Sequence, residues 1–181
     1  MPALIAHRPR AAGAPTGPAR ASLGNGAFCF MTAVVAIQGG HVVEHIIQVV
    51  QVFVLGVAED DALGLLGYLV QFNGTEEWLH LGYNTFYLVS LYALILPLHR
   101  VLPRRAFLFF LVASVWVETW HMVEHGVIIS HVIANSGCPC PGIGDAALGV
   151  SDTVLHLIYN ALAYAGLLYA WVLVRRQRAT S

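Results

Sequence analysis

Four long apolar stretches constrain the fold of this chain more than any other feature. They run over Ala27–Val57, Glu76–Leu98, Ala106–Ile133 and Leu148–Val174. A helix needs about 20 residues to cross the hydrocarbon core of a bilayer, and each stretch reaches that length. Charged residues make up only 10% of the 181 residues and the mean hydropathy is +0.68, whereas soluble domains carry roughly 25% charged residues. The sequence therefore predicts an all-α integral membrane protein, a bundle of four transmembrane helices.

The arginines predict the orientation of the bundle. All the basic residues are arginines, and they lie before the first stretch, between the second and third, and after the fourth: Arg8, Arg10, Arg20, Arg100, Arg104, Arg105, Arg175, Arg176 and Arg178. The other two connections carry acidic residues: Glu59, Asp60, Asp61, Glu76, Glu77 and Asp145. Because arginine-rich loops stay on the inner side, we expect both termini in the cytoplasm and the protein in the plasma membrane. The short apolar segment 62–72 is expected to form an interfacial or re-entrant helix on the outer face.

Two motifs recur in the same order and indicate an internal duplication. His41-Val-Val-Glu-His45 returns as His121-Met-Val-Glu-His125, and His80-Leu-Gly-Tyr-Asn84 returns as His156-Leu-Ile-Tyr-Asn160. Each unit would cross the membrane twice, so the two copies are predicted to be parallel repeats about an axis along the membrane normal. The expected organisation is a disordered tail at residues 1–26, one repeat at 27–98, a second at 99–174, and a short tail at 175–181.

The spacing of the histidines predicts a shared polar face inside the bundle. Residues at i, i+3 and i+4 lie on one face of a helix, and a rise of 1.5 Å per residue places both motifs in the outer half of the membrane. Ionisable residues in a span usually face the bundle interior or a cavity. We therefore predict two transition-metal ions, with a purely structural polar network as the alternative. The predicted ligands are His41, Glu44, His45, His80, His121, Glu124, His125 and His156.

Three glutamates are candidates for catalysis. Glu44 and Glu124 are predicted to bridge the metals or act as bases, and Glu118, one turn before His121, is predicted to be an extra ligand or the residue that orients that histidine. The equivalent of Glu118 in the first repeat is Gln38, so the second metal is expected to be held more tightly. The remaining predicted cofactor-binding residues, one turn from a histidine and expected to support the ligands, are Asn84 and Asn160.

The donor types limit the chemistry. Imidazole with carboxylate suits iron or zinc and imidazole alone suits copper; iron is favoured, and haem, which leaves the paired glutamates unexplained, is less so. The chain lacks the basic field and the glycine-rich phosphate loop of nucleic-acid and nucleotide binders. In its chemistry alone, a histidine-rich di-metal centre is similar to the membrane hydroxylases and desaturases, which place their histidine boxes near the cytoplasmic face.

The predicted function is a membrane oxidoreductase that uses oxygen to oxidise a lipophilic small molecule from the outer leaflet, with an unidentified electron donor. The alternatives are a zinc-dependent hydrolase, a haem-binding bundle, or a transporter of metal or protons. Transport requires polar groups through the full thickness of the membrane, and the inner halves of the spans offer few. The roles of Cys138 and Cys140, in a turn-rich outer loop, stay open.

Overall fold

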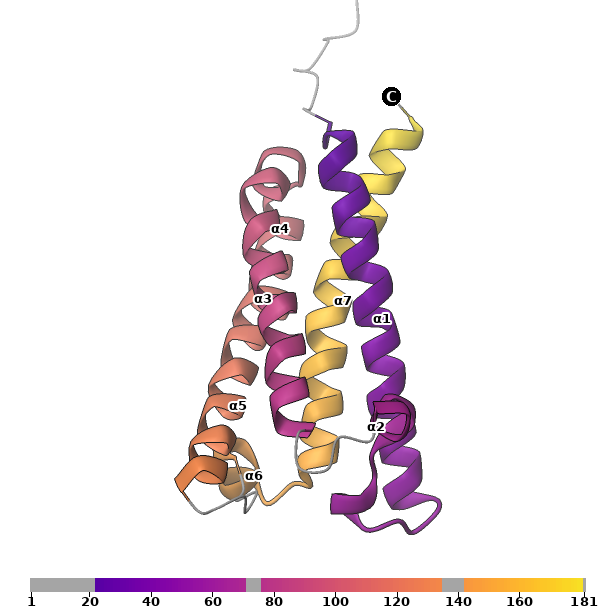
Figure 1. The fold of residues 1–181 in the computed structure, drawn as a ribbon. Helices are drawn as coiled ribbons and strands as arrows, with labels where there is room; N and C mark the ends of the chain where they lie inside the picture. Colours follow the sequence, from indigo (N-terminus) through magenta and orange to yellow (C-terminus); the bar gives the residue numbers. More distant parts are fainter. Residues whose placement is uncertain (1–21, 71–75, 135–141, 181) are drawn as a thin grey trace, which may run out of the picture.

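The computed structural model describes residues 22–70, 76–134 and 142–180, and every regular element in these ranges is helical. The long helices (Figure 1) are α1 (Asn25–Phe53), α3 (Glu76–Val101), α4 (Arg104–Phe110) continued through a π-helical segment (Leu111–Trp116) into α5 (Val117–Ala134), and α7 (Asp152–Ala179). Four segments are long and apolar enough to cross a membrane: α1, α3 from Trp78, Arg104–Ala134 and α7. These helices confirm the predicted all-helical fold with four candidate spans.

Short helices occupy the two connections at one end of the bundle. The first connection holds a 3-10 helix (Glu59–Asp61) and α2 (Gly64–Val70), and the second holds α6 (Ile143–Leu148). The helix expected within residues 62–72 is thus present as α2. The predicted tail up to residue 21 and the loop with Cys138 and Cys140 lie outside the described residues.

Two helix ends differ from the predicted span ends, and a glycine with a left-handed backbone lies close to each. α1 ends at Phe53 rather than at Val57, and Gly56 adopts a φ of 69° just after it. α7 begins at Asp152 rather than at Leu148, which belongs to α6, and Gly149 between the two helices has a φ of 63°. A left-handed backbone of this kind ends a helix and suits glycine, which has no Cβ to clash.

The helices pack mainly across the two halves of the sequence. α1 lies against α7, and α3 lies against α5. Tyr87 from α3 and Ser114 from the π-helical segment both donate hydrogen bonds to the carbonyl of Ala163 in α7, at 3.1 and 2.7 Å. The backbones come so close that a Cβ on Gly166 would stand 3.1 Å from the backbone nitrogen of Ser114. The helices are therefore tightly packed on the side of the bundle toward the start of α1 and the end of α7.

The core in that end is apolar. Its buried side chains include Met31, Val34, Leu91, Leu94, Leu98, Phe110, Leu167 and Val174.

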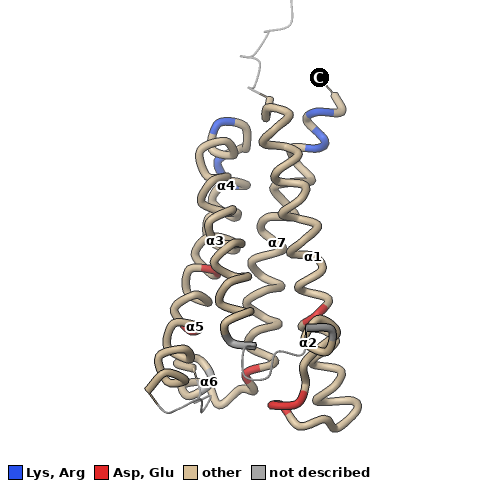
Figure 2. The backbone as a smooth tube through the Cα atoms, viewed as in Figure 1, with Lys and Arg blue, Asp and Glu red and all other residues tan. Residues whose placement is uncertain are grey.

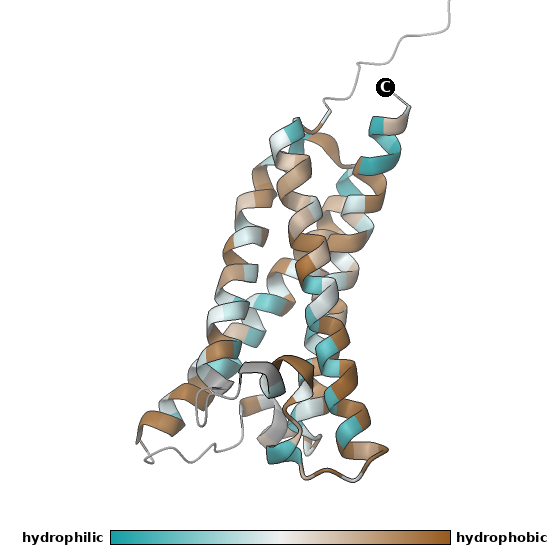
Figure 3. Cartoon of the chain, turned by 45° about the vertical axis from the view of Figure 1, so that its right-hand side comes forward, coloured by the Kyte–Doolittle hydropathy of each residue, from teal (hydrophilic) through white to brown (hydrophobic). Residues whose placement is uncertain are grey.

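The charged residues divide between the two ends of the bundle. Figure 2 shows the described arginines at the end where α7 terminates, and the acidic residues in the other half of the molecule. Figure 3 shows hydrophobic residues along much of the length of the long helices, and many of the large ones are exposed, among them Val43, Val89, Val112 and Leu162. Arg178 bonds the carbonyl of Leu23 and the side chain of Asn25, so the start of α1 and the end of α7 lie together.

Candidate metal centre

Six histidines from all four long helices gather in one cluster inside the bundle. Neighbouring imidazole centroids lie 4.5–6.2 Å apart. The members are those of the repeated motifs, and we name them in two groups. The α1 site is His41, His45 and His80, and the α5 site is His121, His125 and His156.

The histidine pairs of the two HxxEH motifs have closely similar spacing. The two histidines of each HxxEH motif are 4.5 Å apart in α1 and 4.6 Å apart in α5, measured between ring centroids. The contacts between the sites also match: His45 lies 5.9 Å from His156, and His80 lies 6.0 Å from His125. The third histidine lies closer to its pair in the α5 site, at 4.9 and 5.1 Å, than in the α1 site, at 5.8 and 6.1 Å.

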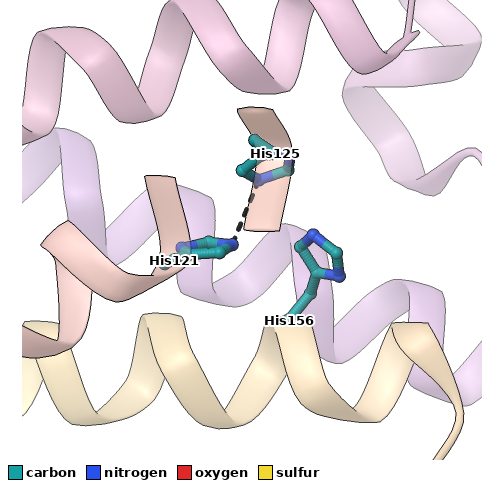
Figure 4. A group of neighbouring side chains, drawn as sticks. All are labelled: His121, His125 and His156. Carbon is teal, nitrogen blue, oxygen red and sulfur yellow. Dashed lines mark hydrogen bonds between the residues drawn. The ribbon is translucent and has the colours of Figure 1, made fainter. Parts of the chain in front are cut away.

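The distances between imidazole nitrogens fit ligation of a metal. In both motifs the two Nε2 atoms lie 3.1 Å apart. Two nitrogens on one ion, each about 2.0–2.1 Å from it at a tetrahedral or square angle, lie about 2.9–3.4 Å apart. In the α5 site the ligand atoms of all three histidines lie within 4.8 Å of one another, and Figure 4 shows these side chains converging from α5 and α7. Each pair thus has the spacing needed to hold one ion.

Neighbouring polar groups orient two of the rings through Nδ1, and the Nδ1 of a third ring faces a carboxyl group without bonding it. Gln48 Oε1 lies 2.7 Å from Nδ1 of His45, and the carbonyl of Asp152 lies 2.9 Å from Nδ1 of His156. Nδ1 of His121 lies 3.6 Å from Oε2 of Glu118. A histidine ligand to a metal usually donates its other N–H to such a group, which fixes the tautomer. The sequence analysis missed Gln48 and Asp152, although their helical spacings of three and four residues from a histidine could have indicated them.

Glu44 and Glu124 have partners other than the histidines. Glu44 accepts a hydrogen bond of 2.6 Å from the backbone N–H of Leu66 in α2. Glu124 accepts bonds of 2.7 and 2.8 Å from the N–H groups of Ile143 and Gly144 in α6. Both carboxylates are buried and bind the first turn of a short helix, where N–H groups have no helical acceptor. The two glutamates therefore anchor the connections that contain α2 and α6, beside the histidine cluster.

Glycines make this anchoring possible. Gly64 has a φ of 68°, and a Cβ there would lie 2.7 Å from Cδ of Glu44. A Cβ on Gly142 would lie 2.6 Å from Oε2 of Glu124, and one on Gly144 would lie 3.0 Å from Oε1. Only residues without a side chain let the backbone N–H groups approach each carboxylate. The glycines in the connections that contain α2 and α6 are the sequence signal that could have indicated this anchoring by glutamate.

The residues one turn below the motifs differ between the two sites. Gln38 donates from Nε2 to Oδ1 of Asn160 at 2.9 Å and accepts from the hydroxyl of Tyr83 at 3.3 Å. Tyr83 also stacks on the ring of His41, with centroids 3.9 Å apart. At the α5 site, Nδ2 of Asn84 lies 2.9 Å from Nε2 of His125. Asn84 thus reaches a predicted ligand directly, whereas Asn160 contacts Gln38.

Comparison with known proteins identifies no relative: no family model, curated protein or solved structure matches the chain.

Proposed function

We propose that this protein is a membrane-embedded oxidoreductase with two first-row transition-metal ions in its histidine cluster, acting on a lipophilic small molecule. The observation that carries the proposal is the cluster itself, six imidazoles from four helices with a matched Nε2–Nε2 distance of 3.1 Å in both motifs. A lone buried histidine is commonly a helix contact. Six in one cluster, with the same Nε2–Nε2 distance in both motifs, favour metal ligation over a structural network.

The donor set favours a redox-active imidazole complex. With Glu44 and Glu124 bonded to backbone N–H groups, the groups that face the centre are mainly imidazoles, which suit copper, iron and zinc. Iron or copper would supply the electron transfer that side chains lack. The same bonds disfavour a zinc hydrolase that uses either glutamate as its base. Haem is disfavoured because the imidazoles pack against one another, and a macrocycle would have to separate the helices.

The position of the cluster supports access from the outer leaflet. The apolar core fills the end of the bundle that holds the start of α1 and the end of α7, and a path for ions through that core would require polar groups. The histidines lie toward the other end, where His80 is partly exposed. A dead-end site within the bilayer favours oxygen and lipid-soluble substrates. In this proposal the chain is two parallel two-helix repeats with cytoplasmic termini in the plasma membrane, in accord with the arginines at one end.

Elemental analysis of the purified protein tests the proposal. We expect close to two equivalents of iron or copper, and loss of both in the double variant His45→Ala, His125→Ala. The control is His99→Ala, because His99 lies against Phe107 outside the cluster. Full metal content in the double variant would reject the site.

A second measurement tests the chemistry. The metal should be reduced by dithionite and re-oxidised by dissolved oxygen, followed by electron paramagnetic resonance or absorption. Two equivalents of zinc would reject oxidation, and an intense Soret band would indicate haem.

A further inference from the structure

Four buried polar atoms near the α5 site lack a hydrogen-bond partner within the described ranges. They are both carboxylate oxygens of Glu118, Oδ1 of Asn84 and Nδ1 of His121. The three side chains are fully buried, with 0% exposure. A buried polar atom left unsatisfied typically costs about 1–3 kcal/mol, and more if it is charged. Such a concentration of open acceptors around a histidine indicates a place for a cation.

The corresponding residues of the α1 site satisfy one another. The side chain of Gln38 donates to Oδ1 of Asn160 at 2.9 Å. Glu118 takes the place of Gln38 three residues before its HxxEH motif, and Asn84 is the counterpart of Asn160. A carboxylate has no N–H to donate, so the bond that closes the α1 side has no equivalent here. The one-residue difference leaves the oxygens of Glu118 unpaired within the described residues, whereas both polar atoms of Gln38 are bonded.

We propose that the α5 site binds metal tightly and the α1 site weakly, with Glu118 as the residue that creates the difference. Nδ1 of His121 faces Glu118 at 3.6 Å and its Nε2 faces His125 at 3.1 Å. If this 3.6 Å separation shortens when metal binds, Nδ1 would donate to the carboxylate, which would keep the lone pair on Nε2, make the imidazole a stronger ligand, and balance the charge of the ion. This inference rests on the proposed metal centre and identifies which of its ions is permanent and which exchanges.

Asn84 completes the α5 site. Its Nδ2 lies 2.9 Å from Nε2 of His125, so the amide turns when that nitrogen binds an ion. The carbonyl Oδ1, which has no hydrogen-bond partner in the described part of the chain, then faces the ion. The α5 site would thus hold its metal with three imidazoles and an amide oxygen.

The backbone also differs between the sites. A π-helical segment, Leu111–Trp116, ends two residues before Glu118, whereas α1 is α-helical throughout Asn25–Phe53. Single π-helical turns are frequent at functional sites, where they change the direction of the residues that follow. This second difference falls on the same helix as the unsatisfied carboxylate.

Titration of cobalt(II) into the metal-free protein tests the inference, because its visible bands report imidazole ligation and equilibrium dialysis reports affinity. The wild-type protein should bind one ion tightly and a second more weakly. Glu118→Gln should weaken the tight step by about 10–100-fold, whereas the matched control Gln38→Ala should leave that step unchanged. Gln38→Glu should strengthen the weak step, because it places a carboxylate behind His41.

The outcomes separate this inference from the metal centre itself. Two equal affinities in the wild-type protein, or unchanged tight binding in Glu118→Gln with no gain in Gln38→Glu, would overturn the inference and leave the metal centre intact. No binding of cobalt, iron or copper to the wild-type protein would reject the metal centre. Thermal unfolding of metal-free Glu118→Gln checks folding, and its Tm should not fall, since glutamine can bond Asn84 as Gln38 bonds Asn160. If that variant does not fold, Gln38→Glu alone decides.

Discussion

The α1–α3 half and the α5–α7 half of this protein share a scaffold and differ in the chemistry they offer. In both halves a pair of histidines has its Nε2 atoms 3.1 Å apart, and the glutamate of the motif bonds the backbone of a short helix, α2 or α6. Below the pair, the first half has the bonded amides Gln38 and Asn160, and the second has the unsatisfied carboxylate of Glu118.

The comparison teaches which residues belong to the scaffold and which to the chemistry. Features present in both halves, such as the glutamate anchors, are sufficiently explained by folding, because each satisfies N–H groups at a helix terminus. A feature present in one half only, such as the carboxyl group of Glu118, which is unpaired within the described residues, is not explained by a helix terminus that it satisfies. Glu118 is buried at a cost that the neutral side chain of Gln38 at the same place in α1 avoids, so folding alone does not explain its presence.

The largest expected effect concerns topology, since parallel repeats require both outer connections on one face. Single cysteines at Asp61 and at Leu148, in a background without Cys29, Cys138 and Cys140, should be fully labelled by an impermeant thiol reagent added to intact cells. A cysteine at Arg104 should be shielded, because arginine-rich loops remain inside. Labelling at Arg104, or at only one of the other two positions, would break the comparison between the halves.

The next effect separates the two metal sites. Removing His41 and His45 together should abolish the weaker site and leave about one tightly bound equivalent, and removing His121 and His125 together should leave only the exchangeable ion. Metal content before and after dialysis distinguishes the two. Loss of both ions from either double variant would show a single shared centre and remove the distinction.

A smaller effect concerns stability without metal loss. Glu44→Ala and Glu124→Ala each remove a buried acceptor of backbone hydrogen bonds, so each should lower the free energy of unfolding by about 1–3 kcal/mol. Hydrogen exchange should increase in α2 for the first variant and in α6 for the second. Metal content should stay at the wild-type level. A fall in metal content with unchanged exchange would instead restore these glutamates as ligands, as the sequence motif predicts.

The smallest expected effect concerns Glu59, which joins the connection between α1 and α3 to the start of α7. Oε1 of Glu59 accepts hydrogen bonds from the hydroxyl of Ser151 and, at 3.0 Å, from the backbone N–H of Thr153 at the start of α7. Partial burial alone would raise the pKa of Glu59, but these hydrogen bonds outweigh it, and the pKa falls below its usual value. A lowered carboxyl pKa contributes stability at neutral pH that is lost as the pH falls through the folded-state pKa.

Glu59→Gln should therefore destabilise the protein at pH 7 by about 0.3–1 kcal/mol, the usual contribution of a carboxylate at a helix N-terminus. The difference from the wild-type protein should vanish below the folded-state pKa of Glu59. Thermal unfolding at pH 7 and at lower pH measures it. A difference that persists at the lowest pH would assign the effect to packing rather than to charge.

The sequence by itself predicted the four spans and the gathering of six histidines. Both follow from local rules: a hydrophobic run of sufficient length forms a spanning helix, and a spacing of four residues places two imidazoles on one face. The equal height of the motifs in different helices follows from counting the rise per residue. Gln48 and Asp152, which orient His45 and His156, lie within one helical turn of them, so helical spacing could also have predicted these contacts.

The tertiary structure alone decided the partners of the polar groups. Glu44 lies on the same helical face as His41 and His45, and the motif predicted it as a ligand. The connection between α1 and α3 brings the N–H of Leu66 to its carboxylate. Likewise, only the packing of α1 against α7 brings Gln38 to Asn160. Helical periodicity fixes the direction of a side chain, but its hydrogen-bond partner depends on loop paths and helix contacts between residues distant in the sequence.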